Sequence, residues 1–356
     1  MVRSRESGYY EGRGEMKVSI KKISEVTGFS PATISNALNN KRGVNRDTAA
    51  EILRVAKEMG YISENRITKI RFVIYKRNGK IIDDTPFFPL LIDGVETECR
   101  KLGYEMSICN LDRRDDDYEE QVRWLVNDTT SAIIFLGTEV MEGDLVGFRS
   151  TKCPFLILDS FDSNMMFDGV LINNADSARV ATEYLIGKGH REIGYLRGDF
   201  RIKAFRSRAV GYARAMMNHG LEANSAYTFT LDTTIEASRR KMAEILKGKP
   251  KLPTAFFADD DVIALGAIKA MQEAGIRVPE DVSVIGFDDL PFCEINTPPL
   301  TTIRVSKQEM GALAVRRIHE MIHETDQCKL KISVCTDFVE RESVRDISKT
   351  RERSGE

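Results

Sequence analysis

The sequence lacks the features that mark disulfide-bonded, secreted and membrane proteins. Its six cysteines are scattered with no Cys-x-x-Cys pair, which favours reduced thiols over a disulfide framework or a zinc site. No apolar run approaches the length that crosses a bilayer, and the polar N-terminus has no signal-peptide core. These absences predict a soluble, cytoplasmic protein that makes no contact with membranes.

Patterns typical of enzymes are also missing. No Ser-His-Asp order, P-loop or G-x-G-x-x-G pattern occurs, so neither enzyme activity nor a cofactor is predicted. One segment, His319-Glu320-Met321-Ile322-His323, matches H-E-x-x-H, whose histidines at i and i+4 can bind zinc. No clear third-ligand pattern follows it. A zinc metalloenzyme therefore remains only an alternative, which metal analysis would test.

The overall formal charge of −2 hides an asymmetry along the chain. Residues 1–69 contain 13 Lys/Arg and 8 Asp/Glu, whereas the remainder contains 39 and 46. A basic head on an acidic body suits binding of a polyanion by the head alone. With 356 residues, the chain has room for two or three domains and a large buried core.

The stretch from Ser19 to Asn39 predicts two short helices joined by a tight turn. Ser19 is a predicted N-cap, and Gly28 can end the first helix because glycine adopts a positive φ without steric cost. Ser30 is predicted to cap the second helix, with Pro31 at its first position, where the missing N–H is no loss. The sequence thus predicts where both helices begin.

Apolar side chains in this stretch recur at helical spacing and predict one buried face on each helix. They are Ile20, Ile23 and Val26 in the first helix and Ile34, Ala37 and Leu38 in the second. The outward positions of the second helix are short or polar: Ala32, Thr33, Ser35 and Asn36. This is the geometry of a helix-turn-helix, whose second helix lies in the DNA major groove. An ordinary helical hairpin within a larger core is the alternative.

A basic turn and a third helix follow. The turn is Asn40-Lys41-Arg42-Gly43, and its cations can reach phosphates, although charged turns are often merely solvated. The third helix is predicted from a cap near Asn45 to Met59, where Gly60 ends it. Its apolar stripe consists of Ala49, Ile52, Leu53 and Ala56.

Composition sets the expected domain limits. Residues 1–15 are Gly-, Arg- and Glu-rich and are expected to be disordered or a non-native extension, with translation starting at Met16. The helix-turn-helix domain is predicted at 16–61, a short linker at 62–69 and a larger domain at 70–344, followed by a disordered tail at 345–356. Within the larger domain, one lobe is expected at about 70–170 plus 304–328, and the other at about 171–303 plus 329–344.

From Ile70 onward, strands and helices alternate. Predicted strands are Ile70–Tyr75, Tyr104–Cys109, Ala132–Leu136, Phe155–Leu158, Ile193–Leu196, Ala255–Ala258 and Val282–Phe287. Predicted helices include Pro89–Leu102, Ala175–Lys188, Ser207–His219 and Val262–Ala274. This alternation predicts an α/β fold with doubly wound parallel sheets, and so many strands fit two sheets better than one. Ligands of such folds bind outside the carboxyl ends of the strands, so the cleft between the two sheets is the expected site.

At this point the sequence resembles the lac-repressor/galactose-repressor family of bacterial transcription regulators, from Met16 to about Val344. Its motifs are Ser30–Asn39, Gly60-Tyr61, Pro86-Phe87-Phe88, Gly189–Ile193, Arg208–Tyr212, Asp261–Ala267, Val282–Asp289 and Pro298–Ile303. The resemblance implies a two-lobed, periplasmic-binding-protein-like body that binds a small effector, most often a sugar, and forms a homodimer. It also implies that the dimer binds a double-stranded, pseudo-palindromic operator, as a repressor in most cases.

The resemblance further implies which residues contact DNA. Pro31, Ala32 and Asn36 are the base-reading positions, and Asn36 can pair bidentately with adenine. Thr33 and Ser35 are better placed for phosphates. The complete predicted set is Ser30, Pro31, Ala32, Thr33, Ser35, Asn36, Asn39, Lys41 and Arg42.

The linker departs from the family pattern. The family usually carries Pro-Asn and then Ala-Arg-Ser-Leu after the third helix, a hinge whose leucine wedges into the minor groove. This chain has the run Tyr61–Ile70 and then enters its first strand, so the proline, the Ala-Arg-Ser-Leu run and part of the usual linker are missing. Arg66 and Lys69 can still contact phosphates, but the leucine wedge has no clear counterpart.

For the effector, the resemblance implies polar groups that converge in the cleft. Arg208 can grip hydroxyls or a carboxylate, and Asp288 can accept hydrogen bonds from ligand hydroxyls. Asp159, at the end of a strand, is expected to do the same from the other lobe. Phe87 and Phe88 are expected to stack on a ring, with lid or core packing as the alternative.

Acidic residues and histidines near the cleft need separate interpretation. The family usually has Asn where this chain has Asp260, which would disfavour an anionic effector if Asp260 faces the cleft. Asp259 is expected to be a solvated charge at a helix start. His190 and His219 are expected to be capping or solvated residues. The other functional class left open is a cytosolic solute-binding protein without operator specificity, against which the helix-turn-helix speaks.

Overall fold

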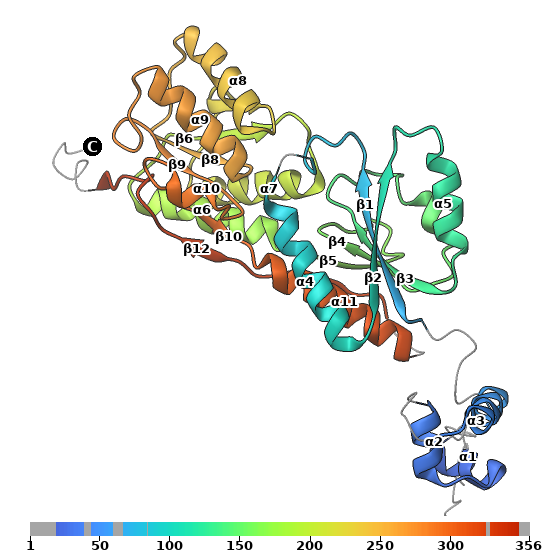
Figure 1. The fold of residues 1–356 in the computed structure, drawn as a ribbon. Coiled ribbons are helices and arrows are strands. Elements are labelled where there is room, and N and C mark those ends of the chain that lie inside the picture. Colours follow the sequence, from blue (N-terminus) through green and yellow to red (C-terminus); the bar gives the residue numbers. More distant parts are fainter. Residues whose placement is uncertain (1–18, 39–43, 60–66, 84, 325–327, 349–356) are drawn as a thin grey trace, which may run out of the picture. The chain divides into compact units, whose positions relative to one another are not determined.

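The computed structural model describes residues 19–38, 44–59, 67–83, 85–324 and 328–348 (Figure 1). The chain divides into two units, residues 1–66 and 67–356. The predictions for residues 1–15, for most of the linker and for Asn39, Lys41 and Arg42 lie outside the described residues. Within the described part, no helix combines the length and apolar character needed to cross a membrane.

The described part of the first unit consists of α1 (Ile20–Thr27), α2 (Pro31–Leu38) and α3 (Arg46–Glu58). The Ser19 hydroxyl accepts a hydrogen bond from the Lys22 N–H at 3.4 Å, and Gly28 ends α1 with φ at 73°. The Ser30 hydroxyl accepts from the Thr33 N–H at 3.1 Å, and α2 begins at Pro31. The predicted caps and helix starts are therefore confirmed.

The core of this unit differs from its prediction at two positions. Its fully or nearly buried members are Ile23, Ile34, Ala37, Ile52 and Ala56. Val26 is 62% exposed and Leu53 is exposed as well. In α1 the position four residues after Ile23 falls closer to the buried face than the position three residues after it, and Thr27 occupies it. The prediction of Val26 and Leu53 as core residues is wrong.

The second unit contains a six-stranded sheet in the order β11-β5-β4-β3-β1-β2, with every neighbouring pair parallel. Its strands are β1 (Lys69–Lys76), β2 (Glu105–Asp112), β3 (Ser131–Leu136), β4 (Phe155–Leu158), β5 (Asp168–Ile172) and β11 (Lys331–Val334). The helices of this lobe are α4 (Phe87–Leu102), α5 (Tyr118–Asn127) and α11 (Lys307–His323). α4 and α11 pack side by side, while α5 lies apart from them (Figure 1).

A four-stranded parallel sheet in the order β7-β6-β8-β9 forms the other lobe. Its strands are β6 (Ile193–Gly198), β7 (Thr228–Leu231), β8 (Ala255–Ala258) and β9 (Ser283–Ile285). Its helices are α6 (Asn174–Gly187), α7 (Lys203–Asn218), α8 (Ile235–Lys247), α9 (Asp261–Glu273) and α10 (Phe292–Ile295). α6 packs on α7, and α8 packs on α9. The predicted architecture of two doubly wound parallel sheets is confirmed.

The chain passes between the lobes at different places than predicted. β5 extends to Ile172, and β11 pairs with it in the first sheet, so 171–172 and 331–334 belong to the first lobe. A separate antiparallel pair consists of β10 (Thr302–Arg304) and β12 (Asp337–Val339). It lies near the second and third places where the chain passes from one lobe to the other. The expected lobe limits at 171 and 329 are therefore corrected to about 173 and 335.

Part of the expected disordered tail is ordered. The Arg345 N–H donates to the Ser283 hydroxyl at 3.0 Å, and the Ile347 N–H donates to the Lys188 carbonyl at 2.9 Å. Residues 345–348 thus pack onto the second lobe, and only the residues after 348 lie outside the described chain. The prediction of a tail disordered from residue 345 is wrong.

Candidate functional site

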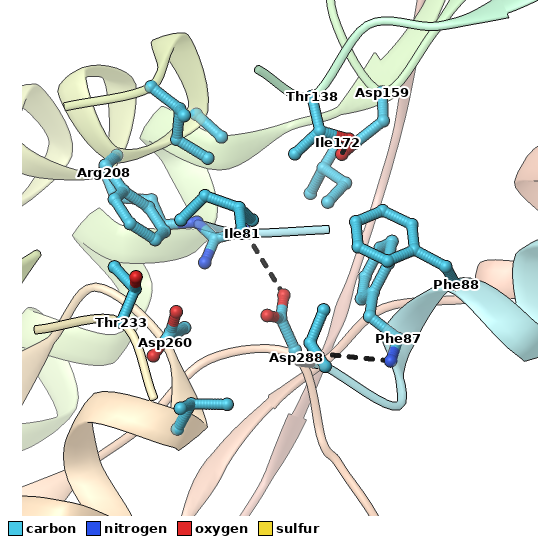
Figure 2. A pocket seen from close by; sticks show the side chains of 15 residues that line it. Ile81, Phe87, Phe88, Thr138, Asp159, Ile172, Arg208, Thr233, Asp260 and Asp288 are labelled. Carbon is cyan, nitrogen blue, oxygen red and sulfur yellow. Dashed lines mark hydrogen bonds and ion pairs between the residues drawn. The ribbon is translucent and has the colours of Figure 1, made fainter. Parts of the chain in front are cut away.

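A pocket between the two lobes brings together side chains from distant segments (Figure 2). All six residues predicted for the effector line it: Phe87, Phe88, Asp159, Arg208, Asp260 and Asp288. Its empty volume, counted to the open mouth, is about 440 Å³.

Asp159 enters the pocket from the first lobe at the end of β4. Its Oδ2 accepts a hydrogen bond from the Thr138 hydroxyl at 2.6 Å, while its buried Oδ1 has no partner among the described residues. Its backbone is in the left-handed region with φ at 62°. The pKa of this carboxyl is raised to about 7, mainly by burial and also by the charge of Asp288, while Thr138 and Arg208 act in the opposite direction. An unpaired buried acceptor in a strained backbone is typical of a ligand site.

Asp260 and Asp288 enter from the second lobe. Asp260 is the N-cap of α9, and its Oδ1 accepts from the Ile263 N–H at 2.7 Å. Burial raises its pKa well above the usual range, and the Asp288 charge acts in the same direction. Burial also raises the pKa of Asp288, although Arg208 and Lys307 partly offset this. Asp288 has a positive φ of 112°, so it too is held in a strained backbone.

Arg208 on α7 is held by three protein groups. Its Nε donates to Asn174 Oδ1 at 2.8 Å, its Nη1 to the Asp259 carbonyl at 2.5 Å and its Nη2 to Asp288 Oδ1 at 3.2 Å. Its guanidinium lies 3.6 Å above the centre of the Phe287 ring. These contacts set the side chain in one orientation and pair it with a carboxylate of the pocket.

The aromatic pair lies at the start of α4 and forms one wall of the pocket. The ring centroids of Phe87 and Phe88 are 5.3 Å apart in an edge-on arrangement, and both side chains are buried. They also belong to the main hydrophobic core. The pair therefore packs in the core and also lines the pocket, while stacking on a ligand ring stays a prediction.

Several lining residues were not predicted. Thr138 follows β3, Thr233 follows β7 and Ile172 ends β5, so all three lie at carboxyl ends of parallel strands. The strand-end rule would have found Thr138, because its strand was predicted. The others escaped because β5 and β7 were not recognised in the sequence. The remaining unpredicted residues that line the pocket are Ile81, Thr85, Ile202, Ala204, Phe205 and Val262.

A loop after β1, residues 77–83, extends to this pocket and is organised by a residue that the sequence analysis missed. Glu139 is fully buried, and its carboxylate accepts hydrogen bonds from the backbone N–H groups of residues 77, 78, 79, 81 and 82 at 2.8–3.4 Å. The loop reaches the second lobe, since the Lys80 carbonyl accepts from the Thr233 hydroxyl at 2.9 Å. Lys80 Nζ also lies 2.5 Å from Asp199. Glu139 thus shapes a loop that joins the lobes beside the pocket.

Two predictions near the site are wrong. Asp259 is fully buried rather than solvated, because its carboxylate accepts from the Tyr195 hydroxyl, the Gly198 N–H and Arg201. His190 is also buried: its Nδ1 lies 2.9 Å from the Thr254 hydroxyl and its Nε2 lies 3.0 Å from the Arg345 carbonyl. His219 is exposed at the end of α7, as predicted.

The H-E-x-x-H segment lies on α11 and makes packing contacts. His319 Nδ1 lies 2.8 Å from the Tyr104 hydroxyl, and the His319 and His323 rings are 4.4 Å apart. Glu320 lies 3.0 Å from the Arg317 guanidinium. Over the described ranges, no three His, Cys, Asp or Glu side chains are grouped to hold a metal ion.

The predicted DNA-reading helix presents its first residues to solvent. Pro31 and Ala32 are exposed, and Thr33, Ser35 and Asn36 are partly exposed. The Ser30 hydroxyl caps α2 and lies 2.8 Å from the Thr33 hydroxyl. Lys69, which was expected near phosphate, begins β1 and lies 3.5 Å from Glu105.

Comparison with known proteins identifies the family. A profile of the periplasmic binding protein-like domain matches residues 182–344. The HTH-type transcriptional repressor PurR of Pasteurella multocida (strain Pm70) is 30% identical over 330 residues, which are 92% of this chain and 98% of that protein. The chain belongs to the lac-repressor/galactose-repressor family. It is therefore a DNA-binding transcriptional repressor with an effector-binding body, not an enzyme.

Solved structures of family members share the fold. The transcriptional regulator CelR in complex with cellobiose has a TM-score of 0.70 and is 24% identical, covering 92% of this chain and 99% of that chain. The lac repressor dimer bound to operator and the anti-inducer ONPF has a TM-score of 0.69 and is 21% identical, with the same coverage. Members of this family bind operator DNA and a small effector and act as dimers.

Proposed function

We propose that this repressor is controlled by a sugar that binds in the pocket between the lobes. The observation that carries the proposal is the convergence of Asp159, Arg208 and Asp288, from both lobes, on a pocket walled by Phe87 and Phe88. Carboxylates accept hydrogen bonds from ring hydroxyls, and an aromatic wall packs against the apolar face of a ring. A protein of this fold in complex with cellobiose supports the same ligand class.

A ligand held by both lobes stabilises them against each other, because it binds the folded protein and not the unfolded chain. A thermal-shift screen of sugars and nucleobases tests the proposal. A sugar at a hundredfold excess over its Kd is expected to stabilise the protein by about 2.7 kcal/mol. Arg208→Met should abolish the shift, whereas the exposed Glu222→Gln should leave it unchanged. Stabilisation by nucleobases alone would refute a sugar effector.

For DNA, we propose that α2 reads a pseudo-palindromic operator in the major groove. The exposure of Pro31 and Ala32 and the partial exposure of Asn36 support this placement. Ser30, Thr33, Ser35, Asn39, Lys41 and Arg42 complete the proposed contact set. Two copies of α2 related by the dimer axis would then read two half-sites.

Asn36→Ala is expected to lower the preference for operator over random DNA by about 1–3 kcal/mol, because a bidentate contact with adenine is lost. Lys41→Ala should instead weaken binding to every sequence alike and reduce the salt dependence by about one released counterion. Fluorescence anisotropy with operator and random duplexes, at several salt concentrations, measures both effects. An equal loss on both duplexes for Asn36→Ala would contradict its role in base readout.

A further inference from the structure

Carboxyl groups outnumber cations in the lining of the effector pocket. Three carboxylates line it, and among the described residues of its wall Arg208 is the single cation. Figure 2 shows Asp159 with Thr138 on one side, Asp260 with Thr233 on the opposite side, and Asp288 between them. A ligand in the middle therefore faces carboxylates on more than one side.

Arg208 does not offer this ligand a free cation. Three of its N–H groups are donated to Asn174, to the Asp259 carbonyl and to Asp288, and its plane packs on Phe287. Lys307, the other nearby cation, donates to the Asp288 carbonyl and lies outside the pocket wall. Both cations thus serve the protein's own groups, and neither is arranged as the receptor for an anionic ligand.

The carboxylates, in contrast, have acceptor capacity left over. Asp159 is 8% exposed, and its Oδ1 has no partner among the described residues. One oxygen of Asp260 caps α9, which leaves the other for the pocket. Buried carboxylates without matching donors are costly, so the ligand is the natural source of the missing donors and positive charge.

The residue at position 260 strengthens the case for a ligand that supplies donors and positive charge. An asparagine at this position would both donate and accept hydrogen bonds. An ionised aspartate only accepts. An ionised aspartate here therefore presents a charge and no donor at the pocket wall, which disfavours a ligand group that accepts and favours a cationic donor.

We propose that the effector is an amino sugar, a ring of monosaccharide size that carries a protonated amine. The inference rests on the proposed sugar-binding function and narrows its ligand class. The ammonium group pairs with Asp260, its N–H groups supplying the donors that this carboxylate lacks. The hydroxyls of the ring donate to Asp159 and Asp288, and its apolar face packs against Phe88.

Isothermal titration calorimetry at pH 7 tests the proposal with three amino sugars, namely glucosamine, galactosamine and mannosamine, each beside its parent hexose. At least one amino sugar is expected to bind ten or more times as tightly as its parent. The parent hexose has a neutral hydroxyl of similar size in place of the ammonium group. N-acetylglucosamine keeps the nitrogen as a neutral but larger amide, and it should bind at least tenfold more weakly than glucosamine if glucosamine is the ligand. The matching N-acetyl compound is the control for each of the other two amino sugars.

The Asp260→Asn variant removes the negative charge at this position and keeps the size and shape of the side chain. This variant is expected to lose at least ten times more affinity for the amino sugar than for the parent hexose, while Glu222→Gln behaves like the unaltered protein. The comparison among sugars on the unaltered protein stands alone if the variant fails to fold.

The outcomes are distinct. Parent or N-acetylated sugars that bind as tightly as the amino sugars overturn the inference and leave a sugar effector in place. If no sugar of either set binds, the sugar function and the inference both fail. Equal loss of hexose and amino sugar in a folded Asp260→Asn variant refutes the assignment of the ammonium group to Asp260.

Discussion

Glu139→Ala is expected to lower the free energy of unfolding by about 3–6 kcal/mol. The carboxylate is fully buried and accepts from five backbone N–H groups of the loop at residues 77–83. Two of these bonds, from Gly79 and Ile81, are themselves buried. Each buried donor left without an acceptor costs about 1.5–3 kcal/mol when its partner was charged.

Urea unfolding followed by circular dichroism measures this loss, with a lower midpoint at an unchanged slope. Glu139→Gln keeps the shape and one acceptor oxygen, so it should lose less. Glu142→Ala, at an exposed position nearby, should match the unaltered protein. If Glu139→Ala unfolds at the same urea concentration as the unaltered protein, the carboxylate does not organise the loop.

The same substitution has a functional consequence. The loop carries Ile81 into the pocket and joins the second lobe through Lys80 and Thr233. Loss of its shape should therefore weaken effector binding. Because the loop is in a different unit from α2, operator affinity in the absence of effector is expected to stay unchanged.

The ligand-free protein is expected to lose stability as the pH rises from about 4 to about 7. The pKa of Asp159 is raised from 3.8 to about 7, first by burial and then by the charge of Asp288, against the effects of Thr138 and Arg208. In this window the folded protein holds a proton that the unfolded chain has released. The stabilisation of the folded protein by the raised pKa of Asp159 is fully present below pH 4 and is lost as the pH rises through about 7. A shift of about three pKa units corresponds to up to about 4 kcal/mol.

Asp159→Asn removes this titration. Thermal melts of the ligand-free protein at pH 5, 6, 7 and 8 should show the variant gaining stability relative to the unaltered protein as the pH rises. Asp260, Asp261 and Asp288 also have raised pKa values because of burial, so part of the pH dependence remains. Melting curves whose pH dependence is the same in both proteins would show that Asp159 does not carry a buried charge.

Local chemistry in the sequence was sufficient to predict the helix-turn-helix. Ser19, Gly28, Ser30 and Pro31 cap or end their helices through contacts within a few residues, so their roles are encoded nearby. Most strands buried in the sheets were found for a related reason, because continuous apolar runs mark them. The buried strand β5 was missed, since it begins with Asp168 and Gly169 and has only a short apolar run. Short or half-exposed strands were missed: β7, β10 and β12 have few residues, and β11 alternates between exposed and partly buried positions.

For the polar residues of the pocket, the sequence predicted the positions but not the hydrogen bonds. Asp159, Arg208, Asp260 and Asp288 could be named from the sequence through their resemblance to family motifs, and strand ends explain why such groups meet. The sequence could not show which of these side chains are already hydrogen-bonded to other groups of the protein. Whether Arg208 is free or held depends on Asn174 and on the Asp259 carbonyl, which are distant along the chain.

The sequence by itself thus determined the two helices of the helix-turn-helix, the alternating α/β body and the predicted effector residues that line the pocket. Only the tertiary structure decided that Glu139 and Asp259 are buried, that β11 returns to the first sheet and that one carboxylate oxygen of the pocket, Asp159 Oδ1, has no partner among the described residues. The physical reason is the range of the interactions. Caps and apolar periodicity act over a few residues, whereas the burial and hydrogen bonding of a charged side chain depend on segments that folding brings together from 60 or more residues away, as for Glu139 and Gly79.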